Sequence, residues 1–121
     1  MTEAPTDLEG PVLAEVSRRL VQLHKESYGR GPTKARSFMS ENVLVCLLEG
    51  GFLPSERTLR DHGHGDLVTN SREAMQDVLR EQFMETVAEI TGRPVIGFMS
   101  ATDEQREMSA EVFVLEPEEP S

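Results

Sequence analysis

The two halves of this 121-residue chain follow the same order of sequence features, and this internal repeat limits the fold most. In each half a helical pattern ends at a Gly-Arg-Pro-type stop, Phe-Met-Ser follows, and then comes an apolar strand ending in Glu. The matching segments are 29–32, 38–40 and 43–49 in the first half, and 92–94, 98–100 and 112–116 in the second. One helix and one hairpin bury too little apolar surface to be stable alone, so the two αββ units are expected to fold together.

The spacing of apolar residues predicts the elements of each unit. Helices are expected over Pro11–Tyr28 and Asp66–Thr91, with a short helix over Pro54–Arg60 between them. Strands are expected over residues 34–39, 43–48, 95–99 and 109–115. The fold class is therefore α+β: a two-layer sandwich of two αββ units, with a four-stranded, mainly antiparallel sheet and two main helices on one face.

One domain is expected over residues 10–116, between disordered acidic tails at 1–9 and 117–121. Its pseudo-repeats span 11–50 and 66–116, and residues 51–65 connect them. Val43–Leu48 is apolar on both of its faces, which is typical of a strand covered on both sides. The core is modest, with six Met and few aromatic residues. We therefore expect a homodimer in which the second sheet face or a helix edge pairs with another copy.

The charge balance excludes some classes of partner. Acids outnumber bases 22 to 12, which gives a formal charge of -10. Nucleic acids and anionic lipids require clustered positive charge, so no nucleic-acid partner is expected. No apolar run approaches the roughly 20 residues that span a bilayer, and the start does not resemble a secretory signal. Direct membrane insertion is not expected, and the expected location is the cytoplasm. The single cysteine, Cys46, is predicted to be a buried small hydrophobe.

The main candidate binding site is the segment 29–36, which carries three bases and no acid. Glycines there would let the backbone approach a bound group, and Arg and Lys side chains would hold an oxyanion. Arg57 could approach from the connector, and the repeat places Arg93 at the equivalent corner. The candidate ligand- or partner-binding residues are Arg30, Gly31, Thr33, Lys34, Arg36, Arg57 and Arg93. In the alternative interpretation these bases simply pair with surface acids such as Glu41 or Glu49.

Catalytic and metal chemistry have weaker signals. His62 and His64 lie beside two aspartates and are weak candidates for zinc or nickel ligands, but a site would need a further ligand and His24 is the only other histidine. The alternative is a solvated turn. The chain contains no Walker A loop and no nucleophile elbow. No catalytic residues, no metal and no cofactor are therefore assigned.

Several strings of the sequence resemble one family. These are Leu23-His24-x-x-x-Tyr28-Gly29-Arg30-Gly31-Pro32-Thr33-Lys34-Ala35, then Glu56-Arg57-Thr58-Leu59, then Phe98-Met99-Ser100 and Glu111-Val112-Phe113-Val114-Leu115. Over residues 10–116 the chain resembles the MpsC-like family of small bacterial proteins, a domain of unknown function. The family name implies a link to a membrane-potential-generating or inorganic-carbon uptake system whose other subunits are membrane proteins. The family has no accepted catalytic residues, so the resemblance assigns none.

These features predict a non-catalytic cytoplasmic accessory or regulatory module. It would bind a partner protein, such as a protein of a membrane system, or a small anion such as bicarbonate or phosphate at the segment 29–36. The alternative is a small enzyme that acts on an anionic substrate at the same place. An enzyme would need a closed cavity with a nucleophile or a perturbed acid beside Arg30, whereas a binding module needs only an exposed basic ledge.

Overall fold

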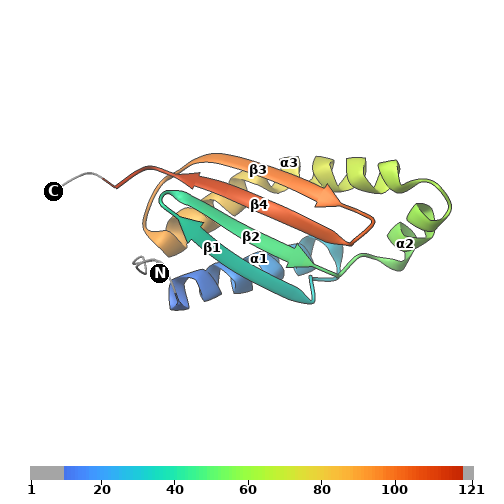
Figure 1. The fold of residues 1–121 in the computed structure, drawn as a ribbon, viewed down its shortest axis with the longest axis horizontal. Coiled ribbons are helices and arrows are strands. Elements are labelled where there is room, and N and C mark those ends of the chain that lie inside the picture. The colour runs from blue at the N-terminus through green and yellow to red at the C-terminus, as the bar shows by residue number, and fades with distance from the viewer. Residues whose placement is uncertain (1–9, 119–121) are drawn as a thin grey trace, which may run out of the picture.

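The computed structural model describes residues 10–118, which form three helices and a four-stranded sheet (Figure 1). The elements in chain order are α1 (Pro11–Tyr28), β1 (Lys34–Ser40), β2 (Val43–Glu49), α2 (Pro54–Asp61), α3 (Gly65–Thr91), β3 (Val95–Asp103) and β4 (Met108–Leu115). The predicted tail at 1–9 and the end of the predicted tail at 117–121 lie outside the described residues. None of the described helices combines the length and apolar character that a bilayer crossing requires.

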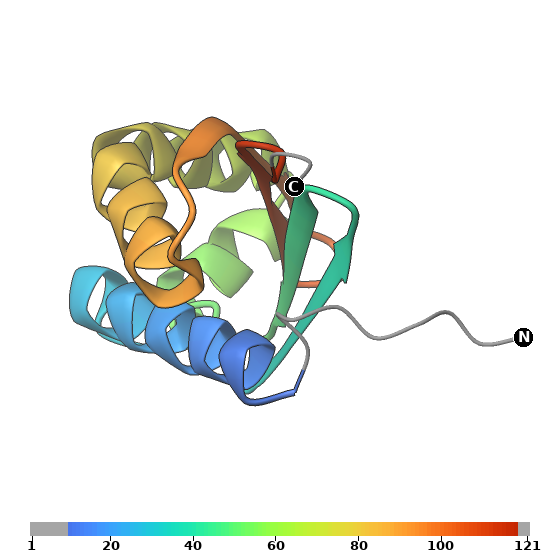
Figure 2. The same ribbon diagram turned by 90° about the vertical axis from the view of Figure 1, so that its left-hand side faces the viewer.

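The sheet has the order β1-β2-β4-β3, and every neighbouring pair is antiparallel. Each hairpin follows its own long helix, and the two hairpins meet where β2 pairs with β4. The long helices α1 and α3 cover the same face of the sheet, as Figure 2 shows. The α+β class and the packing of helices on one sheet face, both predicted from the sequence, are confirmed.

Proline and glycine set the helix boundaries. Pro11 and Pro54 stand at the starts of α1 and α2, where the missing N–H has no intrahelical partner to lose. The Leu53 N–H, just before α2, is bonded by the side chain of Glu56 at 2.8 Å. Gly29 and Gly92 end α1 and α3 with φ values of 84° and 73°, which other residues adopt only at a cost.

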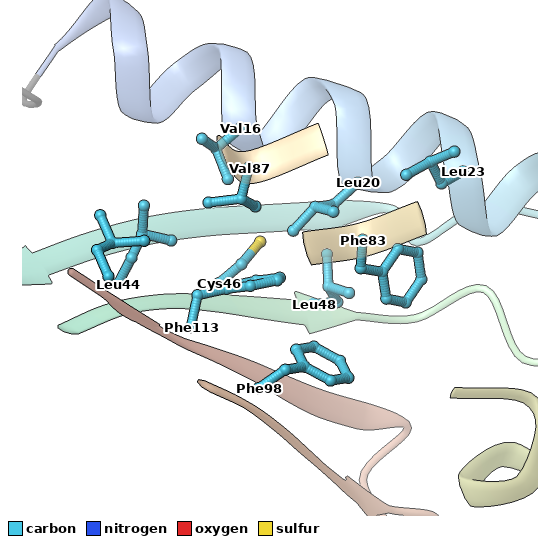
Figure 3. Close-up of a cluster of buried hydrophobic side chains, with 11 residues drawn as sticks. Val16, Leu20, Leu23, Leu44, Cys46, Leu48, Phe83, Val87, Phe98 and Phe113 are labelled. Atoms are coloured by element: carbon cyan, nitrogen blue, oxygen red, sulfur yellow. The ribbon is translucent and has the colours of Figure 1, made fainter. Parts of the chain in front are cut away.

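The hydrophobic core lies between the helix layer and the sheet (Figure 3). Both long helices and all strands except the edge strand β1 contribute buried side chains to it. The core cluster comprises Val16, Leu20, Leu23, Leu44, Cys46, Leu48, Phe83, Val87, Phe98, Phe113 and Leu115. Removing these side chains from water is the main stabilising contribution to the fold. Cys46 is fully buried as predicted, and burial raises the pKa of its thiol to about 11.

Two features differ from the sequence expectations. Strand β3 extends to Asp103 instead of ending near Met99, because the backbone of residues 100–103 continues the pairing with β4. Strand β2 is apolar on both faces, but the helices cover only the face that carries Leu44, Cys46 and Leu48. Within residues 10–118, no element covers the opposite face of the sheet (Figure 2).

Candidate functional site

The predicted basic segment begins in the loop after α1, and this loop packs against a second loop that follows β2. The loop that follows α1 lies against Gly50 and Gly51, which follow β2. A Cβ atom on Gly51 would lie 2.5 Å from the carbonyl oxygen of Gly31, and a Cβ atom on Gly50 would collide with the Thr33 hydroxyl. Thr33 also donates its N–H and its hydroxyl to the Glu49 carbonyl, at 2.9 and 3.2 Å. Gly31 and Thr33 therefore hold two segments of this chain together, whereas the sequence interpretation assigned the glycine to a bound group.

Three bases of this region remain on its surface. Arg30 donates to the Phe52 carbonyl at 3.4 Å, and Arg36 lies 3.6 Å from Glu49 with 50% of its side chain exposed. Lys34 is exposed at the start of β1, and within residues 10–118 no carboxylate lies within ion-pair distance of it. The alternative of pairing with surface acids is thus found for Arg36 alone. We call Arg30, Gly31, Thr33, Lys34 and Arg36 the basic corner.

The two remaining candidates do not contribute free charge to this corner. Arg57 binds both carboxylate oxygens of Glu107 at 2.9 Å. The Arg57 bond and a further bond from Arg60 hold the pKa of Glu107 below its ordinary value, although partial burial opposes them. Arg93 donates to the Glu116 carbonyl beyond the end of β4. The start of β4 pairs with Glu49, so Arg93 lies at the opposite end of the sheet, roughly 24 Å away for seven strand residues.

The weak metal candidates are not brought together with other ligands. His62 Nδ1 bonds the Thr58 carbonyl at 2.8 Å, and His64 is the residue before α3. The third histidine, His24, is buried in the core. Across the described part of the chain, no three His, Cys, Asp or Glu side chains form a group that could hold a metal ion.

A second group of polar residues, which the sequence interpretation did not single out, lies inside the core. His24 on α1, Gln76 on α3 and Glu111 on β4 are exposed by only 2%, 3% and 0%. Tyr28 and Arg72 adjoin them: the Tyr28 hydroxyl accepts a bond from Gln76 at 3.3 Å, and Arg72 stacks on the Tyr28 ring. We call these five residues the buried polar cluster. It joins both long helices to the central strand β4.

The hydrogen bonds of His24 define its tautomer. Its Nδ1 lies 2.7 Å from the Leu20 carbonyl, which can only accept, so Nδ1 carries the proton. Nε2 then carries the lone pair and accepts from the Gln76 amide at 3.3 Å. Burial lowers the pKa of His24, which favours this neutral form. The lone pair of Nε2 lies only 3.8 Å from the carboxyl oxygen Oε2 of Glu111.

Glu111 is a carboxyl group with little to stabilise its charge. Burial raises its pKa to about 7, and the nearby hydroxyls of Ser100 and Ser109 offset only part of that rise. Neither carboxyl oxygen has a well-formed hydrogen bond within residues 10–118. Because a charged carboxylate beside the neutral His24 lone pair is unfavourable, burial at this position favours the protonated form of Glu111 over a wider pH range than for an exposed carboxyl group.

Arg72 connects the cluster to α2. Its guanidinium binds Glu56 through two bonds of 2.8 Å and lies between the rings of Phe52 and Tyr28, at 3.8 and 4.4 Å. Although burial acts to raise the pKa of Glu56, the Arg72 bonds hold it below its ordinary value. This is a charge-assisted, stacked geometry that suits arginine and not lysine.

Beside the cluster, a cleft of about 250 Å³ separates α3 from β3. Its lining residues are Glu73, Gln76, Asp77, Arg80, Phe98 and Ser100. Gln76 Oε1 and Ser100 Oγ are buried and have no hydrogen-bond partner among the described residues. Ser100 lies directly opposite Glu111 in the β3–β4 pairing, so the cleft is lined by a strand neighbour of Glu111.

The sequence contained a signal for the cluster. Glu111 alternates with Phe113 on the buried face of β4, and His24 lies four residues after Leu20 on the buried face of α1. Polar residues in apolar lines of this kind indicate buried polar contacts. The strings that carry the family resemblance also include His24, Tyr28, Glu56 and Glu111.

Comparison with known proteins identifies the family. The family model described as "Na+-translocating membrane potential-generating system (MpsC)" matches residues 9–117. The chain belongs to the MpsC family. Uncharacterized protein YrhF from Bacillus subtilis (strain 168) is 27% identical over 97 residues, which cover 78% of this chain and 80% of that protein. No solved structure matches the chain significantly. The MpsC match includes both the basic corner and the buried polar cluster.

Proposed function

We propose that this MpsC-family chain is a non-catalytic, cytoplasmic accessory or regulatory module that binds an acidic segment of a partner protein at the basic corner. One observation carries the proposal. Lys34 and Arg36 stand two residues apart on β1, so they project from the same side, and both are exposed. They form an open basic ledge in a chain whose formal charge is -10.

The form of the ledge favours an extended carboxylate-bearing segment over a small anion. Tight binding of a small anion needs several donors that converge on one point. Arg57 is already bound to Glu107, and Arg93 lies at the other end of the sheet. The enzymatic alternative is less well supported, because the acid with the raised pKa, Glu111, lies in the helix-covered core and not beside Arg30.

The family name supports the choice of partner. It refers to a Na+-translocating membrane potential-generating system. We therefore propose that the acidic segment belongs to a protein component of such a system. In this role the chain would regulate or assemble the component through charge-assisted hydrogen bonds, which weaken as salt is added.

An NMR titration with a model peptide tests this function and does not require the partner protein itself. The labelled full-length chain is titrated with a short synthetic Glu-rich peptide and, separately, with inorganic phosphate and with bicarbonate. We expect the peptide to shift the amide signals of residues 30–37 in a salt-sensitive way. Arg36→Ala and the double variant Lys34→Ala/Arg36→Ala should remove most of the shift.

Arg19→Ala is the matched control. Arg19 is also partly exposed and also lies near one carboxylate, 3.5 Å from Glu89, but it is on α1. It should bind the peptide like the wild type. Equal shifts in Arg36→Ala and wild type would contradict the proposal. Shifts with phosphate or bicarbonate of the same size as with the peptide would replace the protein partner with a small anion.

A further inference from the structure

The uncovered face of the sheet has a regular arrangement of side chains. Alternate residues of each strand point away from the helices, and the pairing registers order them into four rows across the sheet. Starting at the basic corner, the rows are Lys34–Glu49–Met108–Asp103, Arg36–Leu47–Ala110–Ala101, Phe38–Val45–Val112–Met99 and Ser40–Val43–Val114–Gly97. In the first row Lys34, Glu49 and Asp103 are charged. The other three rows are apolar except for Arg36 and Ser40, which both stand on the edge strand β1.

This composition is unlike that of a solvated sheet face. An antiparallel sheet with one face in water normally alternates apolar and polar residues along each strand. Here both inner strands, β2 and β4, present only Val, Leu or Ala in the last three rows. On the edge strands, Phe38, Met99 and Ile96 are exposed by 49%, 58% and 59%. A continuous apolar patch of this kind marks an interaction surface.

The projected area of the face is a little over half the area that each partner buries in a standard protein interface. Four strands about 4.8 Å apart, each with seven residues of about 3.4 Å, span roughly 450 Å² in projection. Because side chains protrude from the sheet, the accessible area of the face is larger than its projected area. It therefore lies closer to the roughly 800 Å² that each partner buries in a standard interface. A small anion or a peptide would cover only part of it.

We infer that this face binds the same face of a second copy of the chain, which gives a dimer with the layer order helix, sheet, sheet, helix. A two-fold interface must be complementary to itself, and a flat apolar face satisfies this condition without any pairing of charges. Two sheets whose inner faces are apolar pack about 10 Å apart in the same way within single-chain β-sandwiches.

The charged first row determines how the two copies overlap. Burying Lys34, Glu49 and Asp103 against apolar side chains would cost desolvation without compensation. This cost is avoided if the two-fold axis lies between the two sheets, perpendicular to the strands and along the third row. It overlaps the last three rows of each copy and leaves each first row beyond the end of the other sheet. Val45 of one copy then faces Val45 of the other, and Lys34 stays outside the overlap. Arg36, on the edge strand β1, lies at the border of the overlap opposite Ser40 of the second copy, so within the basic corner Lys34 stays accessible in the dimer and Arg36 is partly covered.

Light scattering and sedimentation of the full-length chain test the inference. We expect a mass twice the chain mass of 13.5 kDa at micromolar concentration. Val45→Lys should raise the dimer dissociation constant by about 100-fold or more, because each dimer would bury two unpaired ammonium groups. Met99→Lys should also weaken the dimer, and Met99 is exposed enough in the single chain for this variant to keep its fold.

Val78→Lys is the matched control, since Val78 is 77% exposed on α3 in the other layer. It should leave the dimer intact, and so should Lys34→Ala, which lies outside the overlap and separates this test from that of the basic corner. A wild-type monomer, or a dimer that resists both Val45→Lys and Met99→Lys, would overturn the inferred arrangement.

Discussion

At the scale of single residues, Glu111 makes the stability of the fold depend on pH. Its carboxyl group is fully buried, and burial raises its pKa to about 7. In the unfolded chain the same group titrates near its ordinary value of 4.5. Between these two values the folded state binds more protons than the unfolded state. The contribution of Glu111 to stability is therefore fully present below the unfolded pKa and is lost as the pH rises through the folded pKa.

Glu111→Gln should remove this dependence, because the amide mimics the protonated acid and cannot ionise. We expect the variant to be more stable than wild type by about 1 kcal/mol at pH 5 and by about 3 kcal/mol at pH 8. Urea unfolding at both pH values measures the difference. His24 titrates in both proteins, so the comparison largely cancels its contribution.

Glu81→Gln is the control for this experiment, because Glu81 is exposed on α3. It should change the unfolding free energy little and by the same amount at both pH values. A wild type that becomes more stable relative to Glu111→Gln as the pH rises would show that Glu111 is ionised and paired in the folded state.

At the scale of elements, Arg72 and Glu56 join α2 to α3. Their side chains are exposed by only 7% and 12%, and two bonds of 2.8 Å connect them. Removing one member of such a pair leaves the other charge with little water and without its charged partner, which is more costly than losing an exposed ion pair.

Arg72→Ala should therefore lower the unfolding free energy by about 3 kcal/mol or more, and Arg72→Lys by less. Arg18→Ala, which breaks the exposed Arg18–Glu15 pair, should cost under about 1 kcal/mol. Urea unfolding and a double-mutant cycle with Glu56→Gln measure the coupling. Equal costs for Arg72→Ala and Arg18→Ala would show that the Arg72–Glu56 pair contributes nothing beyond surface charge.

The helix α3 shows how far sequence periodicity could predict the site. The apolar spacing correctly predicted the helix, and Phe83 and Val87 are buried as expected. In the first half of the helix the buried line is Val68, Arg72 and Gln76, while Met75 is only half-buried. Hydrophobic spacing cannot reveal a polar residue whose burial depends on distant partners such as Glu56 or His24. The fold was therefore predictable from local patterns. Within the buried polar cluster, the positions of His24 and Glu111 gave a local signal, whereas the burial of Arg72 and Gln76 and the contacts between the members did not.

The fold brings together only some of the bases that the sequence suggested as a binding site. Lys34 and Arg36 are close in sequence on one strand, so their proximity is a local property. The repeat placed Arg93 at an equivalent position, and a repeat related by the antiparallel β2–β4 pairing puts equivalent positions at opposite ends of the sheet. The order of the strands, which the sequence alone did not provide, decides this.

At the scale of the whole molecule, the net charge opposes formation of the proposed dimer, whereas the open apolar face of the sheet favours it. Two copies with a formal charge of -10 each repel one another, while the contact between apolar rows is insensitive to salt. Raising the salt concentration from low to physiological should therefore tighten the proposed dimer several-fold.

Sedimentation equilibrium over a range of NaCl concentrations measures this effect. Binding of an acidic peptide at the basic corner should change in the opposite direction and weaken with salt. A dimer that dissociates as salt is added would indicate that ion pairs hold it together. The Val45→Lys variant provides the monomer baseline at each concentration.

The last of the four strands to leave the ribosome occupies the middle of the sheet. β4 pairs with β2 on one side and β3 on the other, and it carries Phe113 and Leu115 into the core. During synthesis α1, β1 and β2 are made before β4, so β2 at first lacks its neighbour in the sheet. Pairing between strands that are this far apart in the sequence forms slowly. A premature stop codon ahead of β4 would therefore leave nascent chains with two unpaired strand edges, which are substrates for chaperones and proteases.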